Sequence, residues 1–152
     1  AFLFSEGVQT LGLRMARHCE NALALARFLA GHPAVRWVNY PGLPDSPHHE
    51  VAGRLYGGRY GGLLTFGTGD KESAFRVIDG LKIAKNLANI GDAKTLVIHP
   101  ASTICCDFGP DERALMGVPD DLVRVSAGIE DIRDLIDDFG RALDPASKGE
   151  NA

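Results

Sequence analysis

One residue of this sequence stands out because of its surroundings: an arginine inside an apolar run. Arg124 lies between Val123 and Val125 in a stretch, residues 122–126, that is predicted to be a strand. Because successive side chains of a strand alternate between its faces, Arg124 points to the face opposite both valines. Its planar guanidinium matches a carboxylate in a bidentate way. Two interpretations stay open: an arginine that binds a carboxylate, and one held in an internal or rim salt bridge.

The histidines and cysteines give weaker indications. His99 ends a predicted strand, where an imidazole suits either acid–base chemistry or a structural hydrogen bond. His48 and His49 have no further ligand at metal-binding spacing, so we predict no metal site. Cys105 and Cys106 are adjacent, but no neighbouring feature of the sequence activates either thiol.

Other patterns exclude several kinds of site. The four glycines between residues 57 and 62 match neither a dinucleotide-binding nor a phosphate-binding loop. No Ser–His–Asp arrangement or pair of carboxylates with a cleft signature is visible. Basic residues are scattered and not interleaved with aromatic ones, which argues against a nucleic-acid surface. Residue types and spacing alone therefore indicate a soluble domain that can bind an anion.

The composition limits the class of protein. The chain has 152 residues, which fits one domain with a core, and 45% of them are hydrophobic. Its formal net charge of -4 argues against nucleic acid and anionic membrane as partners. Three cysteines, two of them adjacent, are a poor disulfide framework, so we expect a cytoplasmic location. No apolar run reaches the length of a membrane span.

The beginning of the chain suggests a fragment. The sequence lacks an initiator Met and starts on the apolar residues Phe2, Leu3 and Phe4. Apolar residues then recur every three or four positions over residues 6–31, which predicts an amphipathic helix that ends at Gly31. At 1.5 Å per residue this helix is roughly 40 Å long, about as long as the domain is wide. We expect the apolar start of the chain to cause self-association, and the protein to be a homo-oligomer.

The order of the shorter elements predicts the fold class. Strands are predicted at 35–40, 62–66, 95–98 and 122–126, and helices at 48–56, 70–81, 110–116 and 129–143. Asp70 is a plausible N-cap, and Glu130 and Asp131 suit the positive end of the last helix. The order predicts an α/β fold of the α+β sandwich type, with about four strands and with helices mainly on one face. Residues 1–143 form this domain, and residues 144–152 a disordered tail.

Four segments carry a resemblance to one family. Residues 7–18 read GVQTLGLRMARH, 38–44 read VNYPGLP, 87–103 read LANIGDAKTLVIHPAST, and 122–131 read LVRVSAGIED. In this order they resemble the interdomain helix, a "YPGL" stretch, a loop with its following strand, and the closing motif of Cys/Met-metabolism pyridoxal-phosphate enzymes. The third segment is the most specific. It resembles the O-acetylhomoserine sulfhydrylases more than the cystathionine synthases and lyases, which tend to carry Ser-Leu-Gly-Gly there.

The resemblance implies a fold-type I enzyme whose pyridoxal phosphate is held mainly by a large N-terminal domain outside this sequence. The family's Schiff-base lysine lies in an upstream Ser/Thr-Lys context that none of the lysines here shares, so we nominate no catalytic or cofactor-binding residue. Arg124 matches the arginine that grips the α-carboxylate of the substrate. Asn89 matches the loop position whose backbone helps to hold that carboxylate.

The implied reaction is a γ-replacement, in which sulfide or a thiol displaces acetate from O-acetylhomoserine to give homocysteine or methionine. The chain would then be the C-terminal, substrate-binding part of the enzyme and not a complete catalyst. A cystathionine γ-synthase or γ-lyase, and a free-standing non-catalytic ligand-binding domain, are the alternatives. Ile104 and Cys105 stand where many relatives have Thr and His, so a hydroxyl and an imidazole are missing near the expected site.

Overall fold

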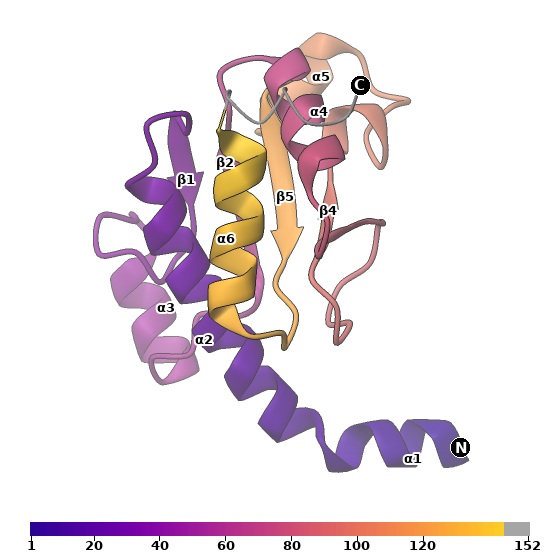
Figure 1. Ribbon diagram of the computed structural model, residues 1–152. Helices are drawn as coiled ribbons and strands as arrows, with labels where there is room; N and C mark the ends of the chain where they lie inside the picture. The colour runs from indigo at the N-terminus through magenta and orange to yellow at the C-terminus, as the bar shows by residue number, and fades with distance from the viewer. Residues whose placement is uncertain (145–152) are drawn as a thin grey trace.

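A five-stranded sheet forms the centre of the protein in the computed structural model, which describes residues 1–144 (Figure 1). The strands lie in the order β1-β2-β5-β4-β3. Their bounds are Trp37–Asn39 for β1, Leu63–Gly67 for β2, Lys85–Asn86 for β3, Leu96–Ile98 for β4 and Leu122–Ser126 for β5. β5 is the central strand and pairs antiparallel with both of its neighbours, whereas β3 and β4 are parallel. The sheet thus places the strand that carries Arg124 in its middle.

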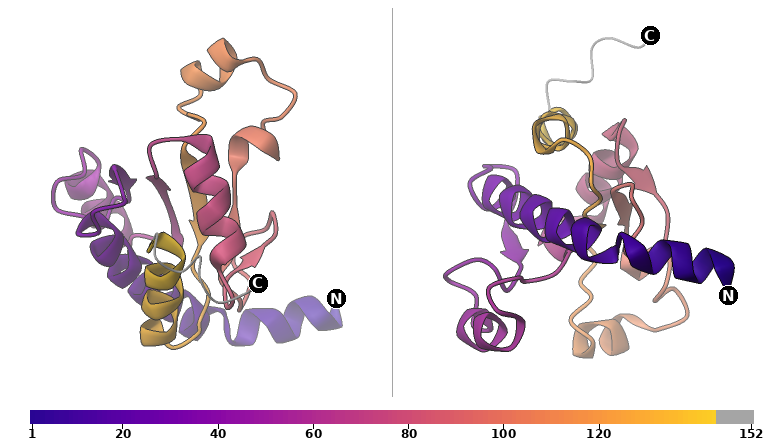
Figure 2. Two further views of the ribbon diagram at one scale, coloured as in Figure 1. Left: turned by 45° about the horizontal axis from the view of Figure 1, so that its top comes forward. Right: turned by 90° about the horizontal axis from the view of Figure 1, so that it is seen from below.

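Three helices cover one face of this sheet (Figure 1). They are α2, Leu11–Ala30, α4, Lys71–Gly80, and α6, Ile132–Leu143. Helix α6 contacts both α2 and α4, and these two helices contact the strands. The shorter helices α3, His49–Tyr56, and α5, Pro110–Leu115, lie outside this layer, as does the 3-10 turn Pro100–Ser102 (Figure 2). Helix α1, Phe2–Gln9, extends away from the body and contains no buried residue (Figures 1 and 2).

The core lies between the sheet and the three helices. Val123 and Val125 of β5 are fully buried in it, beside Phe66 of β2, whose ring meets that of Phe139 of α6 edge-on at 6.3 Å. Because side chains alternate along β5, Arg124 is directed to the opposite face of the sheet. Arg124 and the two valines thus lie on opposite faces of the sheet, as the alternation in the sequence predicted.

The predicted fold class is confirmed, with three differences in detail. The sheet has five strands instead of about four, because β3 is only two exposed residues long and shows no alternation in the sequence. The long helix is broken at Thr10, near Gly7 and Gly12, which both disfavour helix. The last helix starts at Ile132 and not at residue 129.

The caps of two helices agree with the sequence. Asp70 caps α4 by accepting a hydrogen bond from the Ser73 N–H at 2.7 Å. Asp131 caps α6 in the same way, accepting from the Arg133 N–H at 2.9 Å. Within residues 1–144, no helix is long and apolar enough to cross a membrane. The predicted disordered tail lies outside the described residues except for Asp144, which directly follows α6.

A buried carboxylate joins α6 to the segment that follows α4. Asp138 is fully buried and accepts hydrogen bonds from the backbone N–H groups of Lys82, Ile83 and Ala84 at 2.8, 2.9 and 3.1 Å. Arg141 adds a fourth contact at 3.1 Å. Asp138 therefore satisfies three backbone donors at the entrance to β3, which leads into the loop of residues 87–92.

Candidate anion-binding site

Arg124 lies on the open face of the central strand, between Thr65 of β2 and Ile98 of β4. Its Nη2 donates a hydrogen bond to the backbone carbonyl of Asn89 at 3.2 Å. Its Nε is buried and has no partner among the described residues. No carboxylate within residues 1–144 forms an ion pair with Arg124, so an internal salt bridge does not explain the residue. The guanidinium is oriented by one neutral acceptor and keeps donors for an anion.

Asn89 and Arg124, the two predicted substrate-binding residues, are 35 residues apart in sequence and contact each other through a hydrogen bond. The contact uses the carbonyl oxygen of Asn89, while its N–H donates to the Leu87 carbonyl at 3.2 Å. The side-chain oxygen of Asn89 accepts from the Ile90 N–H at 2.9 Å. What the structure places at Asn89 is thus a group that orients the guanidinium. A direct contact between Asn89 and a carboxylate stays a prediction.

The loop that carries Asn89 is attached to the sheet at a second point. The Gly91 N–H donates to Oγ of Ser126 at 3.3 Å, and Ser126 is only 3% exposed. Gly91 has a φ of +72°, a conformation that L side chains rarely adopt. Ser126 was not among the residues predicted from the sequence. The spacing Arg-x-Ser on a strand, which puts both side chains on one face, is the signal that could have identified it.

A hydrogen-bond network fixes the far end of this loop. Glu130 accepts from the N–H and the hydroxyl of Thr95 at 2.6 and 2.9 Å, and the Thr95 hydroxyl accepts from the Gly128 N–H at 2.8 Å. The network joins the start of β4 to the segment after β5. Glu130 therefore anchors the base of the loop and does not lie inside the last helix, where the sequence placed it.

A small cavity of about 260 Å³ lies next to the loop. Ile90 and Gly91 line it together with Ser126, Leu63 of β2 and Met15 of α2. Its lining is mostly apolar side chains and backbone. The first half of α2 thus lies close to the loop and to the open face of β5.

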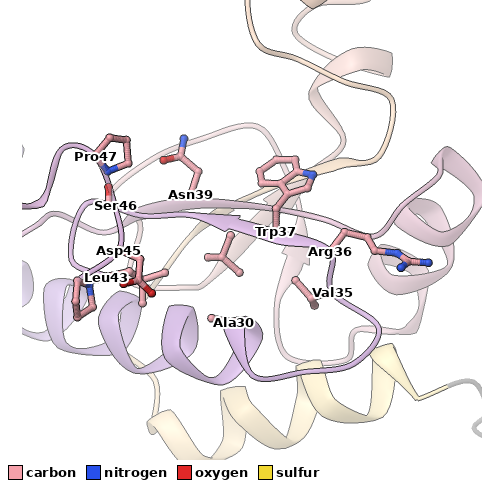
Figure 3. A pocket seen from close by; sticks show the side chains of 11 residues that line it. Ala30, Val35, Arg36, Trp37, Asn39, Leu43, Asp45, Ser46 and Pro47 are labelled. Atoms are coloured by element: carbon pink, nitrogen blue, oxygen red, sulfur yellow. The ribbon is translucent and has the colours of Figure 1, made fainter.

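A second cavity, of about 430 Å³, lies at the edge strand β1 (Figure 3). Its charged lining residues, Arg36 and Asp45, do not converge, because the side chain of Arg36 extends away from the loop that carries Asp45 (Figure 3). No residue of β5 or of residues 87–92 lines this cavity. It is therefore separate from the Arg124 site.

The other residues considered from the sequence do not join this site. His99 is 3% exposed, and both ring nitrogens are engaged at 2.8 Å, one with the Ser102 hydroxyl and one with the Asp120 carbonyl. Its role is structural. Cys105 is buried and Cys106 exposed, and both are free thiols. Within residues 1–144 no three His, Cys, Asp or Glu side chains gather in a way that could hold a metal ion.

Lysines that could bind pyridoxal phosphate covalently would have to line a pocket. Lys71, Lys82, Lys85 and Lys94 are all exposed. Lys85 donates to the Lys82 carbonyl, and Lys71 lies 5.4 Å from the centre of the Phe75 ring. None of the four lines the cavity beside Ser126. Lys148 lies outside the described residues.

Comparison with known proteins gives one consistent family. The family model described as Cys/Met metabolism PLP-dependent enzyme matches residues 1–144. The chain is 49% identical over 138 residues to O-acetyl-L-homoserine sulfhydrylase 1 of Thermus thermophilus, covering 90% of this chain and 33% of that protein. It is 47% identical over 146 residues to a homocysteine synthase of Schizosaccharomyces pombe, covering 95% of this chain and 34% of that protein.

The comparison of structures agrees. A crystal structure of a putative O-acetylhomoserine (thiol)-lyase of Campylobacter jejuni, with a pyridoxyl-lysine monophosphate, matches with a TM-score of 0.83 and 36% identity. The match covers 91% of this chain and 33% of that one. The chain thus spans about a third of the length of the relatives it matches.

Proposed function

Because this chain belongs to the Cys/Met metabolism PLP-dependent enzyme family, we propose that it forms the substrate-carboxylate site of an O-acetylhomoserine sulfhydrylase. In the whole enzyme, sulfide or a thiol would replace the acetate of O-acetylhomoserine and give homocysteine or methionine. The two relatives described as O-acetyl-L-homoserine sulfhydrylase and homocysteine synthase support this proposal, at 49% and 47% identity.

One observation carries the proposal: Arg124 is a partly buried guanidinium that has no carboxylate partner among residues 1–144. Burying a charge without a counter-ion is costly, so an anion is the missing partner that the site calls for. The planar fork fits an α-carboxylate, and the Asn89 carbonyl holds one edge of it in place. Arg124 would bind and orient the amino acid, a positioning role.

Pyridoxal phosphate, when bound, supplies the electron sink for this chemistry. The residues of this chain contribute to it by fixing where the substrate lies. Arg124 holds the carboxylate, and the loop of residues 87–92 closes one side of the site. The small cavity beside Ile90 and Leu63 is largely apolar, which limits the water next to this loop.

The acyl group and the nucleophile are the finer parts of the proposal. An O-succinylhomoserine sulfhydrylase of Mycobacterium tuberculosis is 42% identical over 148 residues, which is lower than the 49% identity to the relative described as an O-acetyl-L-homoserine sulfhydrylase. We therefore favour the acetyl ester. We also propose a cytoplasmic homo-oligomer, which the free cysteines and the exposed apolar side chains Phe2, Leu3 and Phe4 support.

A substrate panel tests this function. The cofactor-loaded enzyme that carries this chain is supplied with O-acetyl- or O-succinylhomoserine and with sulfide, methanethiol or cysteine, and the products are separated by chromatography. We expect homocysteine from the acetyl ester and sulfide as the main product. Cystathionine as the main product would instead identify a cystathionine synthase, and no turnover with any pair would favour a non-catalytic binding domain.

A further inference from the structure

The loop of residues 87–92 is held against the sheet almost entirely by polar contacts. Leu87 and Ile90 are 54% and 58% exposed, so apolar burial does little to fix the loop. The loop's internal contacts, such as that between Asn89 and Ile90, give it a shape but do not attach it to the sheet. The start of the loop is bonded to β4 by the Leu87 N–H, which donates to the Val97 carbonyl at 3.1 Å. The position of its middle, residues 89–91, must therefore come from the points at which it touches β5.

Within residues 1–144, two side chains of the sheet form hydrogen bonds to this loop. Arg124 donates to the Asn89 carbonyl at 3.2 Å, and Ser126 accepts from the Gly91 N–H at 3.3 Å. Both side chains lie on one face of β5, two residues apart, which corresponds to roughly 7 Å along a strand. Their loop partners are also two residues apart. One contact engages a backbone carbonyl and the other a backbone N–H. Together they fix the distance of the loop backbone from the sheet and its rotation.

We propose that Ser126 is a positioning residue for the carboxylate site. Its hydroxyl holds the Gly91 N–H in place. Through the loop backbone, this also fixes the distance between the Asn89 carbonyl and the sheet, so that the carbonyl orients the Arg124 guanidinium. Without this hydroxyl the loop keeps the backbone hydrogen bond from the Leu87 N–H to the Val97 carbonyl at its start, but the Arg124 contact is then its one side-chain attachment near Asn89 among residues 1–144. The guanidinium is then less firmly oriented. Ser126 touches neither the carboxylate nor the cofactor, and its effect passes through Asn89 and Arg124. This inference rests on the proposed carboxylate-binding role of Arg124.

Ser126 is well suited to this task because it is itself immobile. It is 3% exposed and sits in the register of the sheet between Leu63 of β2 and Leu96 of β4. A small hydroxyl on a central strand therefore offers a fixed acceptor to an exposed loop. Alanine at this position keeps the strand and removes only the acceptor.

The test uses the holoenzyme that carries this chain, with the variants Ser126→Ala and Ser126→Thr. A hydrogen bond of ordinary strength corresponds to roughly three- to tenfold in affinity. We expect Ser126→Ala to raise the KM for the amino-acid substrate by about that factor and to leave kcat within about twofold. Ser126→Thr keeps the hydroxyl and should restore most of the affinity. Thr68→Ala is the matched control, because Thr68 is a buried hydroxyl at the end of β2 that contacts Asp121 and not the loop.

A second readout does not depend on turnover. Hydrogen exchange followed by mass spectrometry should show faster exchange over residues 87–92 in Ser126→Ala, and unchanged exchange over β4. Unchanged loop exchange, or faster exchange without any change in KM, would overturn the proposal. The variant Arg124→Lys distinguishes a failure of the Ser126 proposal from a failure of the proposed carboxylate site. If Arg124→Lys raises KM and Ser126→Ala does not, only the proposed role of Ser126 is wrong. If neither variant changes KM, the proposed carboxylate site is wrong as well.

Discussion

The guanidinium of Arg124 and the carbonyl of Asn89 meet at 3.2 Å across 35 residues of sequence. An arginine bound to a neutral carbonyl is held in place without losing its charge. A carboxylate partner would have oriented the side chain equally well and neutralised it. The Arg124 site is thus oriented and still able to attract an anion.

Arg124→Lys should raise the KM for the amino-acid substrate in the intact enzyme. Lysine keeps the positive charge but has no planar fork, so it cannot both donate to Asn89 and bind a carboxylate in a bidentate way. We expect an increase of about tenfold or more, which corresponds to roughly 1.4 kcal/mol. Steady-state kinetics measure it, and an unchanged KM would remove Arg124 from the carboxylate site.

Gly91→Ala should weaken substrate binding through the backbone alone. Gly91 has a φ of +72° and open space where a Cβ would lie, so the only cost is conformational, about 1–2 kcal/mol. The loop can relieve that cost by turning the Gly91 N–H away from Ser126. Gly117→Ala is the matched control, since Gly117 has a φ of +69°, equally open space and a position beside α5. We expect only Gly91→Ala to change KM, and equal effects of the two variants would contradict this.

Asp138→Ala should strongly destabilise the domain. The change leaves three backbone N–H groups, those of Lys82, Ile83 and Ala84, without their acceptor in or near the core. We expect the free energy of unfolding to fall by about 3 kcal/mol, measured by urea denaturation. Asp137→Ala, at an exposed position of the same helix, is the control and should cost little. A similar loss in both variants would mean that the hydrogen bonds from the three N–H groups to Asp138 are not responsible, because alanine itself favours the helix.

The N-cap of α6 should make the protein less stable in acid. Hydrogen bonds from the Arg133 side chain and backbone lower the pKa of Asp131 from 3.8 to about 2. Because this pKa is depressed in the folded state, the stabilisation is present above about pH 3.8 and is lost as the pH falls toward 2. Asp131→Asn should therefore show a smaller drop in Tm between pH 4 and pH 2 than the unchanged protein, in calorimetric scans.

Asp137→Asn is the control for that pH dependence. Its side chain is exposed and forms no hydrogen bond within residues 1–144, so it should lose Tm in acid just as the unchanged protein does. An Asp131→Asn variant with the same pH dependence as this control would show that the cap does not contribute.

Local patterns predicted much of the fold. The alternation around Arg124 placed the residue on the correct strand, and the resemblance supplied Asn89 as its companion. Both assignments depend on short stretches of sequence, in which the side-chain period determines the face. The predicted strands and helices differ from the observed ones mainly at their ends, where caps such as Asp131 decide the boundary.

Contacts between distant segments were beyond such patterns. β3 exists because Lys85 and Asn86 lie beside β4, and nothing in their own polarity indicates a strand. Ser126 reads as an ordinary strand residue until Gly91, 35 positions earlier, is placed over it. Glu130 looked like a helix-terminus acid, because the sequence does not reveal that Thr95 lies within hydrogen-bond distance. In each case the partner is set by tertiary structure.

Helix α1 has a consequence of a different kind. It has eight residues, none of them buried, and helices shorter than about 12 residues are marginal in water without external support. The helix–coil equilibrium of this segment is therefore controlled from outside the body of the domain. Any surface that binds the helical form will raise its population by mass action, by a factor set by the concentration of that surface divided by its dissociation constant. Its helix content therefore reports on such binding and can be followed by amide exchange at Phe2–Gln9.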